Sequence, residues 1–303
     1  MISVPILFIA FNRPHEAREV FEAIRIARPS TLYIAVDGPR KDRAGDLEQC
    51  ILVRNISNFV DWPCKVNTLF HNHNLGCKRA VVSAIDWFFS SEEMGIILED
   101  DCVPSINFFR FCEELLYHYK EDTRIWHIGG TNPLASRAQE SNLYYFSNYN
   151  RIWGWATWRR AWDQFNVDIP FWPSIHEQKV VEQILGHQAA NHFNPLFWDA
   201  YNCNVDTWDY QWFLYRLLNG LSIIPMVNLV ANIGFNTNAT HTVDPNHWLS
   251  KLKYGKFKFP ISHPQFFVPN SALDNEWINL ICSKPGTLQK LKDRITKLGT
   301  HKE

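Results

Sequence analysis

Short apolar runs alternate with longer helical patterns over the first 130 residues of the chain. The apolar runs end at polar or turn-forming segments, which is typical of buried strands. Alternation of this kind predicts βαβ units and a mainly parallel sheet flanked by helices. The expected strands are residues 4–11, 32–37, 65–70, 95–99 and 125–129, and the expected helices are residues 15–27, 44–58, 77–90 and 106–120.

The pattern loosens after residue 130 into turn-rich sequence with many tryptophans, densest at residues 151–158. A helix is expected around residues 208–212, and an apolar run covers residues 221–233. Near the end of the chain, apolar residues at helical spacing predict an amphipathic helix over residues 288–298.

Composition excludes some classes of protein. The formal net charge is -1 with acids and bases mixed, so the chain lacks the basic footprint that a nucleic-acid-binding protein needs. Seven cysteines are scattered singly, which predicts neither a zinc knuckle nor a disulfide framework and favours a reducing compartment. No run approaches the roughly 20 apolar residues that cross a bilayer. We therefore expect a cytoplasmic protein, soluble or peripheral at the inner face of the membrane.

Thirteen tryptophans contribute to an aromatic content of 15%. Indole faces suit the C–H groups of sugar rings, but tryptophan is also a large core residue. Composition alone therefore leaves carbohydrate binding and core packing both open.

An acidic triplet, Glu99-Asp100-Asp101, directly follows the apolar strand at residues 95–98. Ligands of open parallel sheets bind beyond the carboxyl ends of the strands, where this triplet is expected to lie. Adjacent carboxylates disfavour one another's ionisation unless a cation or solvent offsets their charge. A hard divalent cation that bridges to a diphosphate would do so; a solvated acidic turn is the other interpretation.

Several of these segments together resemble the GT-A glycosyltransferases, in particular the branch of the β-1,2-N-acetylglucosaminyltransferase that initiates complex N-glycans. The resemblance rests on residues 4–13, 36–37, 97–101, 107–109 and 154–155. Bacterial members of the group are more similar still, because they share the Trp-Gly-Trp-Ala-Thr-Trp, Trp-Asp-Tyr-Gln-Trp and Ala-Thr-His-Thr segments found here.

The resemblance implies an α/β fold of the GT-A type, Rossmann-like, with a Trp-rich acceptor half and a C-terminal helical extension. Residues 1–240 would form the catalytic domain, divided into a nucleotide-sugar-binding half (1–130) and an acceptor half (131–240), and residues 241–303 the extension. The implied reaction is inverting transfer of a sugar from a UDP-sugar, UDP-GlcNAc foremost, with Mn²⁺ or Mg²⁺ as cofactor. The implied acceptor is a glycan or lipid-linked oligosaccharide in bacterial surface polysaccharide synthesis.

The resemblance also implies roles for individual residues. Asp101 would bind the metal directly, and His241 is a second candidate ligand. The residues implied to bind the nucleotide-sugar are Arg13, Asp37, Asn74, Lys78, Arg79, Glu99 and Asp100.

An inverting transferase needs a carboxylate that takes the proton from the acceptor hydroxyl. Asp209 is the preferred candidate, because flanking indoles would partly desolvate it and raise its proton affinity. Asp206 is the reserve, and Asp168 and Glu177 lie nearer to the Gly-Trp element. The tryptophans considered for the acceptor site are Trp153, Trp155, Trp208 and Trp212.

Two other functions are rivals to the transferase. Sugar-1-phosphate nucleotidyltransferases need a glycine-rich loop after the first strand, and residues 12–15 contain no glycine. A catalytically degenerate protein that binds a glycan or nucleotide-sugar is the remaining alternative.

One basic segment suggests a further partner. Lysines alternate with aromatic residues over residues 251–259. This pattern fits either contact with an anionic membrane surface or an ordinary solvated edge.

Overall fold

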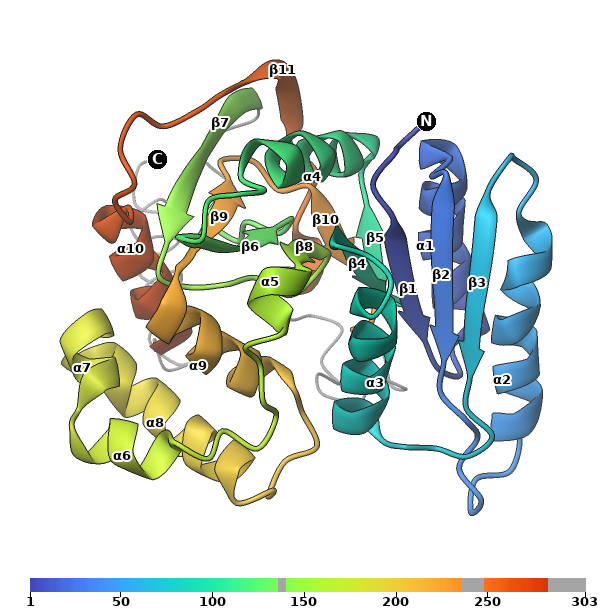
Figure 1. Ribbon diagram of the computed structural model, residues 1–303, viewed down its shortest axis with the longest axis horizontal. Coiled ribbons are helices and arrows are strands. Elements are labelled where there is room, and N and C mark those ends of the chain that lie inside the picture. The colour runs from blue at the N-terminus through green and yellow to red at the C-terminus, as the bar shows by residue number, and fades with distance from the viewer. Residues whose placement is uncertain (136–139, 236–247, 283–303) are drawn as a thin grey trace, which may run out of the picture.

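The structure is a computed structural model that describes residues 1–135, 140–235 and 248–282 (Figure 1). Within these ranges a nine-stranded sheet has the order β11-β7-β9-β6-β8-β4-β1-β2-β3. The strands are β1 (Ile6–Ala10), β2 (Thr31–Val36), β3 (Lys65–Phe70), β4 (Met94–Glu99), β6 (Ile125–Gly129), β7 (Glu140–Ser147), β8 (Trp155–Trp158), β9 (Leu221–Pro225) and β11 (Lys256–Ser262). Strands β5 (Cys102–Pro104) and β10 (Val230–Asn232) form a separate antiparallel ribbon.

Four helices belong to the βαβ part of the chain: α1 (Pro14–Ala27), α2 (Asp46–Arg54), α3 (Cys77–Phe89) and α4 (Ile106–His118). The second half adds α5 (Arg159–Trp162), α6 (Trp172–Glu177), α7 (Val180–Leu185), α8 (His187–Tyr201), α9 (Asp209–Asn219) and α10 (Ser271–Cys282). Short 3-10 helices are η1 (Asn55–Phe59) and η3 (Trp248–Lys251). No helix among the described residues is both long and apolar enough to cross a membrane.

The predicted βαβ part is confirmed. All five expected strands and all four expected helices are present, although the helix expected at residues 44–58 divides into α2 and η1. Five of the eight neighbouring strand pairs are parallel, so the sheet is mainly parallel as expected. Antiparallel β8 lies between β4 and β6 and joins the two halves of the sheet.

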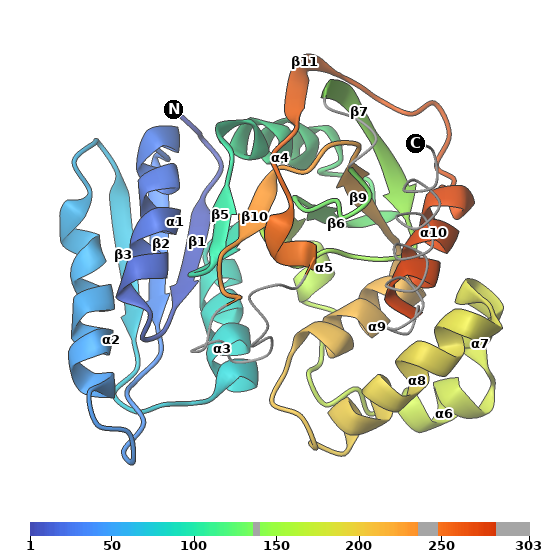
Figure 2. The same cartoon turned by 180° about the vertical axis from the view of Figure 1, so that it is seen from behind.

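Apolar side chains cover both faces of the parallel strands. Phe8 and Ile34 face α1 and α4, whereas Ile9 and Ala35 face α3. Figures 1 and 2 show α3 and α1 on opposite faces of the sheet. Burial on both faces explains why these strands appear in the sequence as continuous apolar runs rather than alternating patterns.

The C-terminal part of the chain is built into the fold. Strand β11 pairs with β7 at one edge of the sheet, and Ile278 of α10 belongs to the core that also contains α8 and α9. The segment after residue 241 thus adds a strand and a helix to the body of the protein. The amphipathic helix expected at residues 288–298 lies outside the described residues.

Candidate functional site

The carboxyl ends of β1 and β4 lie side by side. The two strands are parallel neighbours, with Ile9 paired to Glu99 in the register. The loop after β1 carries Arg13, and the turn after β4 carries Asp100 and Asp101. The fold therefore brings together residues almost 90 positions apart in the sequence.

Arg13 bridges the two aspartates of the triplet. Its Nη1 donates to Oδ2 of Asp101 over 3.0 Å, and its Nη2 pairs with Oδ1 of Asp100. The other oxygen of Asp100 accepts the backbone N–H of Phe11 at 3.1 Å. Only 4% of the Asp100 side chain is exposed, so both of its oxygens are used inside the protein. Arg13 thus fixes the first loop to the acidic turn.

The charges in this cluster shift one another's proton affinities. Burial alone would lower the pKa of Arg13, but Asp100 and Asp101 outweigh it and raise that pKa. Burial raises the pKa of Asp100, and the Arg13 guanidinium opposes that shift. The guanidinium therefore stays charged and stabilises the acidic turn.

Glu99 lies on the other side of the strand. Side chains alternate along a strand, so Glu99 shares the face of Ile97, which packs toward α3. Burial, then the charges of Asp101 and Asp100, and more weakly Asp209, raise the pKa of Glu99 to about 8. Glu99 makes no hydrogen bond through its side chain to any other described residue.

Asp101 is held closely by the β5–β10 ribbon. The thiol of Cys102 lies 3.3 Å from Oδ1 of Asp101, and the backbone N–H of Ile233 donates to the Asp101 carbonyl at 2.8 Å. A Cβ at position 234 would stand 2.2 Å from Oδ2 of Asp101. Gly234 is therefore needed for the close approach of this backbone to the carboxylate.

Asp37 and Asn74 join two strand-end loops. Asp37 is buried, and it accepts hydrogen bonds from the backbone N–H groups of Gly38 (2.7 Å) and Leu75 (3.0 Å) and from Nδ2 of Asn74 (2.8 Å). Burial raises the pKa of Asp37, and the hydrogen bonds from Leu75 and Gly38 counter that rise. In this arrangement both residues hold the loops after β2 and β3 together.

Asp206 caps helix α3 from the second half of the chain. Its two oxygens accept the backbone N–H groups of Cys77 at 2.8 Å and Lys78 at 3.0 Å, which are free donors at the start of a helix. Gly76 has φ +81°, and a Cβ there would lie 2.7 Å from Oδ2 of Asp206. Lys78 also directs its Nζ toward Cys203 at 3.6 Å, while Arg79 is exposed.

Asp209 lies at the start of α9, where it accepts a hydrogen bond from Thr207. Its charge contributes to the raised pKa of Glu99 and also to that of Cys77. Burial is the largest cause at Cys77, followed by Glu99, Asp206 and Asp209. Cys77 therefore lies where the acidic strand end meets the two candidate bases.

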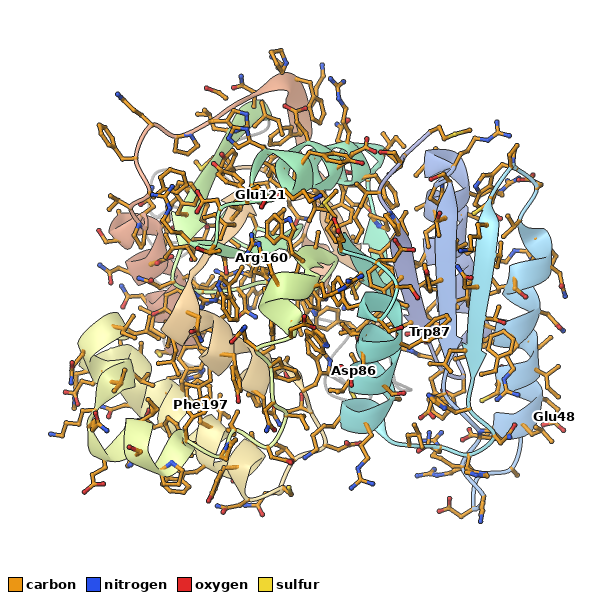
Figure 3. The ribbon with its side chains drawn as sticks, viewed as in Figure 1. Glu48, Asp86, Trp87, Glu121, Arg160 and Phe197 are labelled. Atoms are coloured by element: carbon orange, nitrogen blue, oxygen red, sulfur yellow. The ribbon has the colours of Figure 1, made fainter. Side chains whose placement is uncertain are left out.

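Three of the four predicted acceptor tryptophans are buried. Trp155, Trp208 and Trp212 have at most 2% exposure, and the ring of Trp155 lies 5.5 Å from that of Trp208 and 5.6 Å from that of Trp212. These indoles form a core beneath β4 and α9 and have no face open to a sugar. Among the core tryptophans, Trp162 donates to Asp86 at 2.7 Å. Figure 3 labels Asp86 on α3.

Trp153 differs from these three, because it is only partly buried. Its ring meets that of Phe235 edge-on at 5.5 Å. Phe235 follows Gly234 directly, so Trp153 lies on the side of the site where Asp101 is held.

The donor set of the acidic turn suits a hard cation, because it consists of carboxylate oxygens. The Arg13 guanidinium already places positive charge against Asp100 and Asp101. Among the described residues, no group of three or more His, Cys, Asp and Glu side chains is arranged to hold a metal ion. His241 lies outside the described residues.

Sequence reasoning missed Cys102, Gly234 and the Phe11 backbone donor. Cys102 and Gly234 are remote from each other in sequence and meet through pairing of β5 with β10. Neither belongs to a motif, so the sequence holds no signal that would have identified them.

No family model matches the chain, and no curated protein is similar to it. Similar solved structures include HddC from Yersinia pseudotuberculosis, with a TM-score of 0.35 and 11% identity over 56% of this chain and 85% of that chain. A second HddC structure, complexed with GMP-PN, has a TM-score of 0.32 and 10% identity over 52% and 77%. A UDP-glucose pyrophosphorylase complexed with UDP-glucose has a TM-score of 0.28 and 11% identity over 48% and 62%. At TM-scores this low, nothing about the ligands of this chain follows from these structures.

Proposed function

We propose that the protein is an inverting, metal-dependent glycosyltransferase of the GT-A type. It would transfer a sugar from a UDP-sugar, UDP-GlcNAc foremost, to a glycan or lipid-linked acceptor in bacterial surface polysaccharide synthesis. One observation chiefly supports this proposal: Arg13 and the triplet Glu99-Asp100-Asp101 meet at the carboxyl ends of two adjacent parallel strands, where open α/β sheets bind their ligands.

The donor side of the proposed reaction uses the groups around this strand end. Arg13 carries a planar, permanently charged fork that suits diphosphate oxygens. Asp101, with His241 as the second candidate, would hold Mn²⁺ or Mg²⁺, which when bound supplies positive charge that stabilises the departing nucleoside diphosphate. Glu99, which has no described hydrogen-bond partner, is assigned to hydroxyl groups of the donor sugar.

The acceptor side uses Asp209 as the base. Its carboxylate would take the proton from the attacking hydroxyl as the bond to the anomeric carbon forms and the bond to the diphosphate breaks. The charge of Asp209 supports this assignment, because it helps to raise the pKa of Glu99, the residue assigned to the donor sugar. Trp153, beside Phe235, is the acceptor tryptophan that retains exposed surface.

Calorimetry with UDP in the presence and absence of Mn²⁺ tests the donor site. We expect UDP affinity to rise with Mn²⁺ and this increase to disappear in Asp101→Ala. Release of free UDP from a panel of UDP-sugars then tests turnover. Binding without turnover on any acceptor would support the degenerate binding protein instead, and metal-independent UDP affinity would contradict the proposed metal site.

Two tryptophan variants test the acceptor side. Trp153→Ala should raise the KM for the acceptor and leave that for the donor nearly unchanged. Trp208→Phe serves as the matched control, because its ring lies in the core and its loss should lower stability without a selective change in acceptor KM. If the two substitutions raised the acceptor KM equally, Trp153 would not belong to the acceptor site.

A further inference from the structure

The segment 248–273 has an unusual charge for this protein. It contains four lysines and no aspartate or glutamate, whereas the whole chain has a net charge of -1. The lysines are Lys251, Lys253, Lys256 and Lys258, and all four are exposed. A local excess of positive charge on an otherwise neutral protein indicates an anionic partner.

The same segment exposes large apolar side chains. Tyr254 is 46% exposed, Phe266 69% and Val268 67%. Tyr254 lies within the run of lysines, and Phe266 and Val268 follow on the connection from β11 to α10. An exposed tyrosine ring among lysines suits the boundary of a lipid bilayer, where charged head groups adjoin an apolar interior.

Strand β11 determines which side chains face outward. Lys256 and Lys258 are exposed, while Phe257 and Ile261 between and beyond them are buried. β11 is the edge strand of the sheet, so its outer side is not covered by another strand of the described sheet. Figure 2 shows β11 at this edge beside α4.

The surroundings of β11 add one cation and one acid from α4. The Arg110 guanidinium lies 3.9 Å from the centre of the Phe259 ring. Glu114 accepts the backbone N–H of Ile261 at 3.4 Å, on the part of β11 beyond the lysines. Glu140 of the neighbouring strand β7 lies opposite Lys256 in the register, so the excess of positive charge rests chiefly on Lys251, Lys253 and Lys258.

We propose that the basic edge, defined as Lys251, Lys253, Tyr254, Lys256 and Lys258, docks the protein on an anionic membrane surface. The lysines supply attraction to acidic lipid head groups, and the Tyr254 ring supplies an amphipathic contact at the interface. Phosphate groups of nucleic acids and phosphoproteins are usually bound by arginine, which forms two hydrogen bonds to them at once. This segment contains no arginine. These features favour a lipid surface over those macromolecules.

The basic edge adjoins the candidate site through the β5–β10 ribbon. The Tyr254 hydroxyl donates to the Val103 carbonyl at 3.0 Å, and Val103 follows Asp101 and Cys102 in the chain. The backbone N–H of Gly255 donates to the Asn228 carbonyl at 2.9 Å, just before β10. Docking would therefore hold this ribbon near the bilayer. If the proposed transferase function holds, that position suits a lipid-linked acceptor.

Flotation with vesicles tests the basic edge in the full-length chain. We expect the protein to bind vesicles that contain phosphatidylglycerol, to bind phosphatidylcholine vesicles weakly, and to lose binding as salt is raised. Replacing all four lysines by glutamine should weaken binding roughly a hundredfold or more, since each lysine contributes several-fold. The single substitution Tyr254→Ser should also weaken vesicle binding, without changing the dependence of that binding on salt.

The matched control replaces four exposed lysines elsewhere by glutamine, which gives the same change in net charge. These are Lys41, Lys65, Lys120 and Lys179. The control should bind vesicles like the wild type, and melting curves should show that both variants are folded. Equal loss in the two variants, equal binding to both vesicle types, or binding to heparin without binding to vesicles would overturn the proposal. Vesicle binding is measured without UDP. Failure of the membrane proposal can therefore be distinguished from failure of the proposed transferase function.

Discussion

Arg13 donates from Nη1 to Oδ2 of Asp101 over 3.0 Å, and this ion pair occupies the carboxylate proposed as the direct metal ligand. A divalent cation and the Arg13 guanidinium would therefore compete for one carboxylate. Nucleotide binding offers Arg13 a second anionic partner, the diphosphate, so metal and nucleotide should bind cooperatively.

Replacement of Arg13 by glutamine should reveal this competition. The substitution leaves Asp100 buried without its cationic partner, so the free energy of unfolding should fall by about 3 kcal/mol. Mn²⁺ should restore more stability to the variant than it adds to the wild type, because a cation can then approach both aspartates. Urea unfolding with and without Mn²⁺ measures both effects.

Arg25→Gln is the control for that experiment. Arg25 pairs with Glu22 and Asp61 at the surface, where solvent screens the charges, so its loss should change stability little. Its response to Mn²⁺ should equal that of the wild type. If Arg13→Gln responds to Mn²⁺ no more than Arg25→Gln does, Arg13 and metal do not compete.

Gly234→Ala should impair the metal site. The new Cβ would stand 2.2 Å from Oδ2 of Asp101, so the carboxylate has to move by on the order of 1 Å. Such a displacement is expected to lower kcat by about a hundredfold, with weaker Mn²⁺ binding by calorimetry. Gly186→Ala is the control: an added Cβ would meet no neighbouring atom within 4 Å, and its backbone (φ +82°, ψ 166°) lies in a region that is almost restricted to glycine, so only stability should fall, by roughly 1–3 kcal/mol. Normal Mn²⁺ affinity in Gly234→Ala would show that Asp101 is not the ligand.

Asp206 and Asp209 can be distinguished by amide substitution. Asp206→Asn keeps one oxygen for the start of α3 and loses the other, so we expect about 1 kcal/mol of lost stability and nearly normal turnover. Asp209→Asn should reduce turnover by about 10² to 10⁴ without a comparable change in UDP affinity. The opposite result, with turnover abolished only in Asp206→Asn, would make Asp206 the base.

His127 should make the protein sensitive to acid. Its Nε2 lies 2.9 Å from the Arg151 carbonyl, and Trp212 donates to its Nδ1 at 3.2 Å, so the ring is neutral with the proton on Nε2. Burial lowers the pKa of His127 to about 3, against about 6.5 in the unfolded chain.

The sign of the effect follows from that difference. The unfolded chain takes up a proton below about pH 6.5 and the folded protein does not, so stability is full above that pH and falls as the pH drops toward 3. At pH 5 the expected loss is about 2 kcal/mol. Urea midpoints measured from pH 8 to pH 4.5 check this. His127→Gln should flatten the profile, and an unchanged profile would assign the acid sensitivity to other groups.

The parallel half of the fold was predictable because its signals are local. Strands β1, β2 and β4 are largely apolar runs, and helix α3 repeats its apolar residues at helical spacing. Arg13 and the acidic triplet each follow a predicted parallel strand. That position alone predicts that they lie at the same edge of the sheet.

The second half was less predictable because its roles depend on long-range packing. Trp208 and Trp212 are compatible with a sugar platform in sequence, and only the positions of β8 and α9 bury them. Asp206 acquires its role as a cap because it meets Cys77, 129 residues earlier in the chain. Contacts of this kind leave no periodic trace in a single sequence.

Insertion of β8 between β4 and β6 also has a consequence for synthesis on the ribosome. β4 ends at Glu99, but the strand that covers its outer side begins only at Trp155. At roughly 5–20 residues per second, the interval between them is on the order of 3 to 10 seconds. During that time the nascent chain carries an apolar strand with an open edge, a natural point of contact for chaperones.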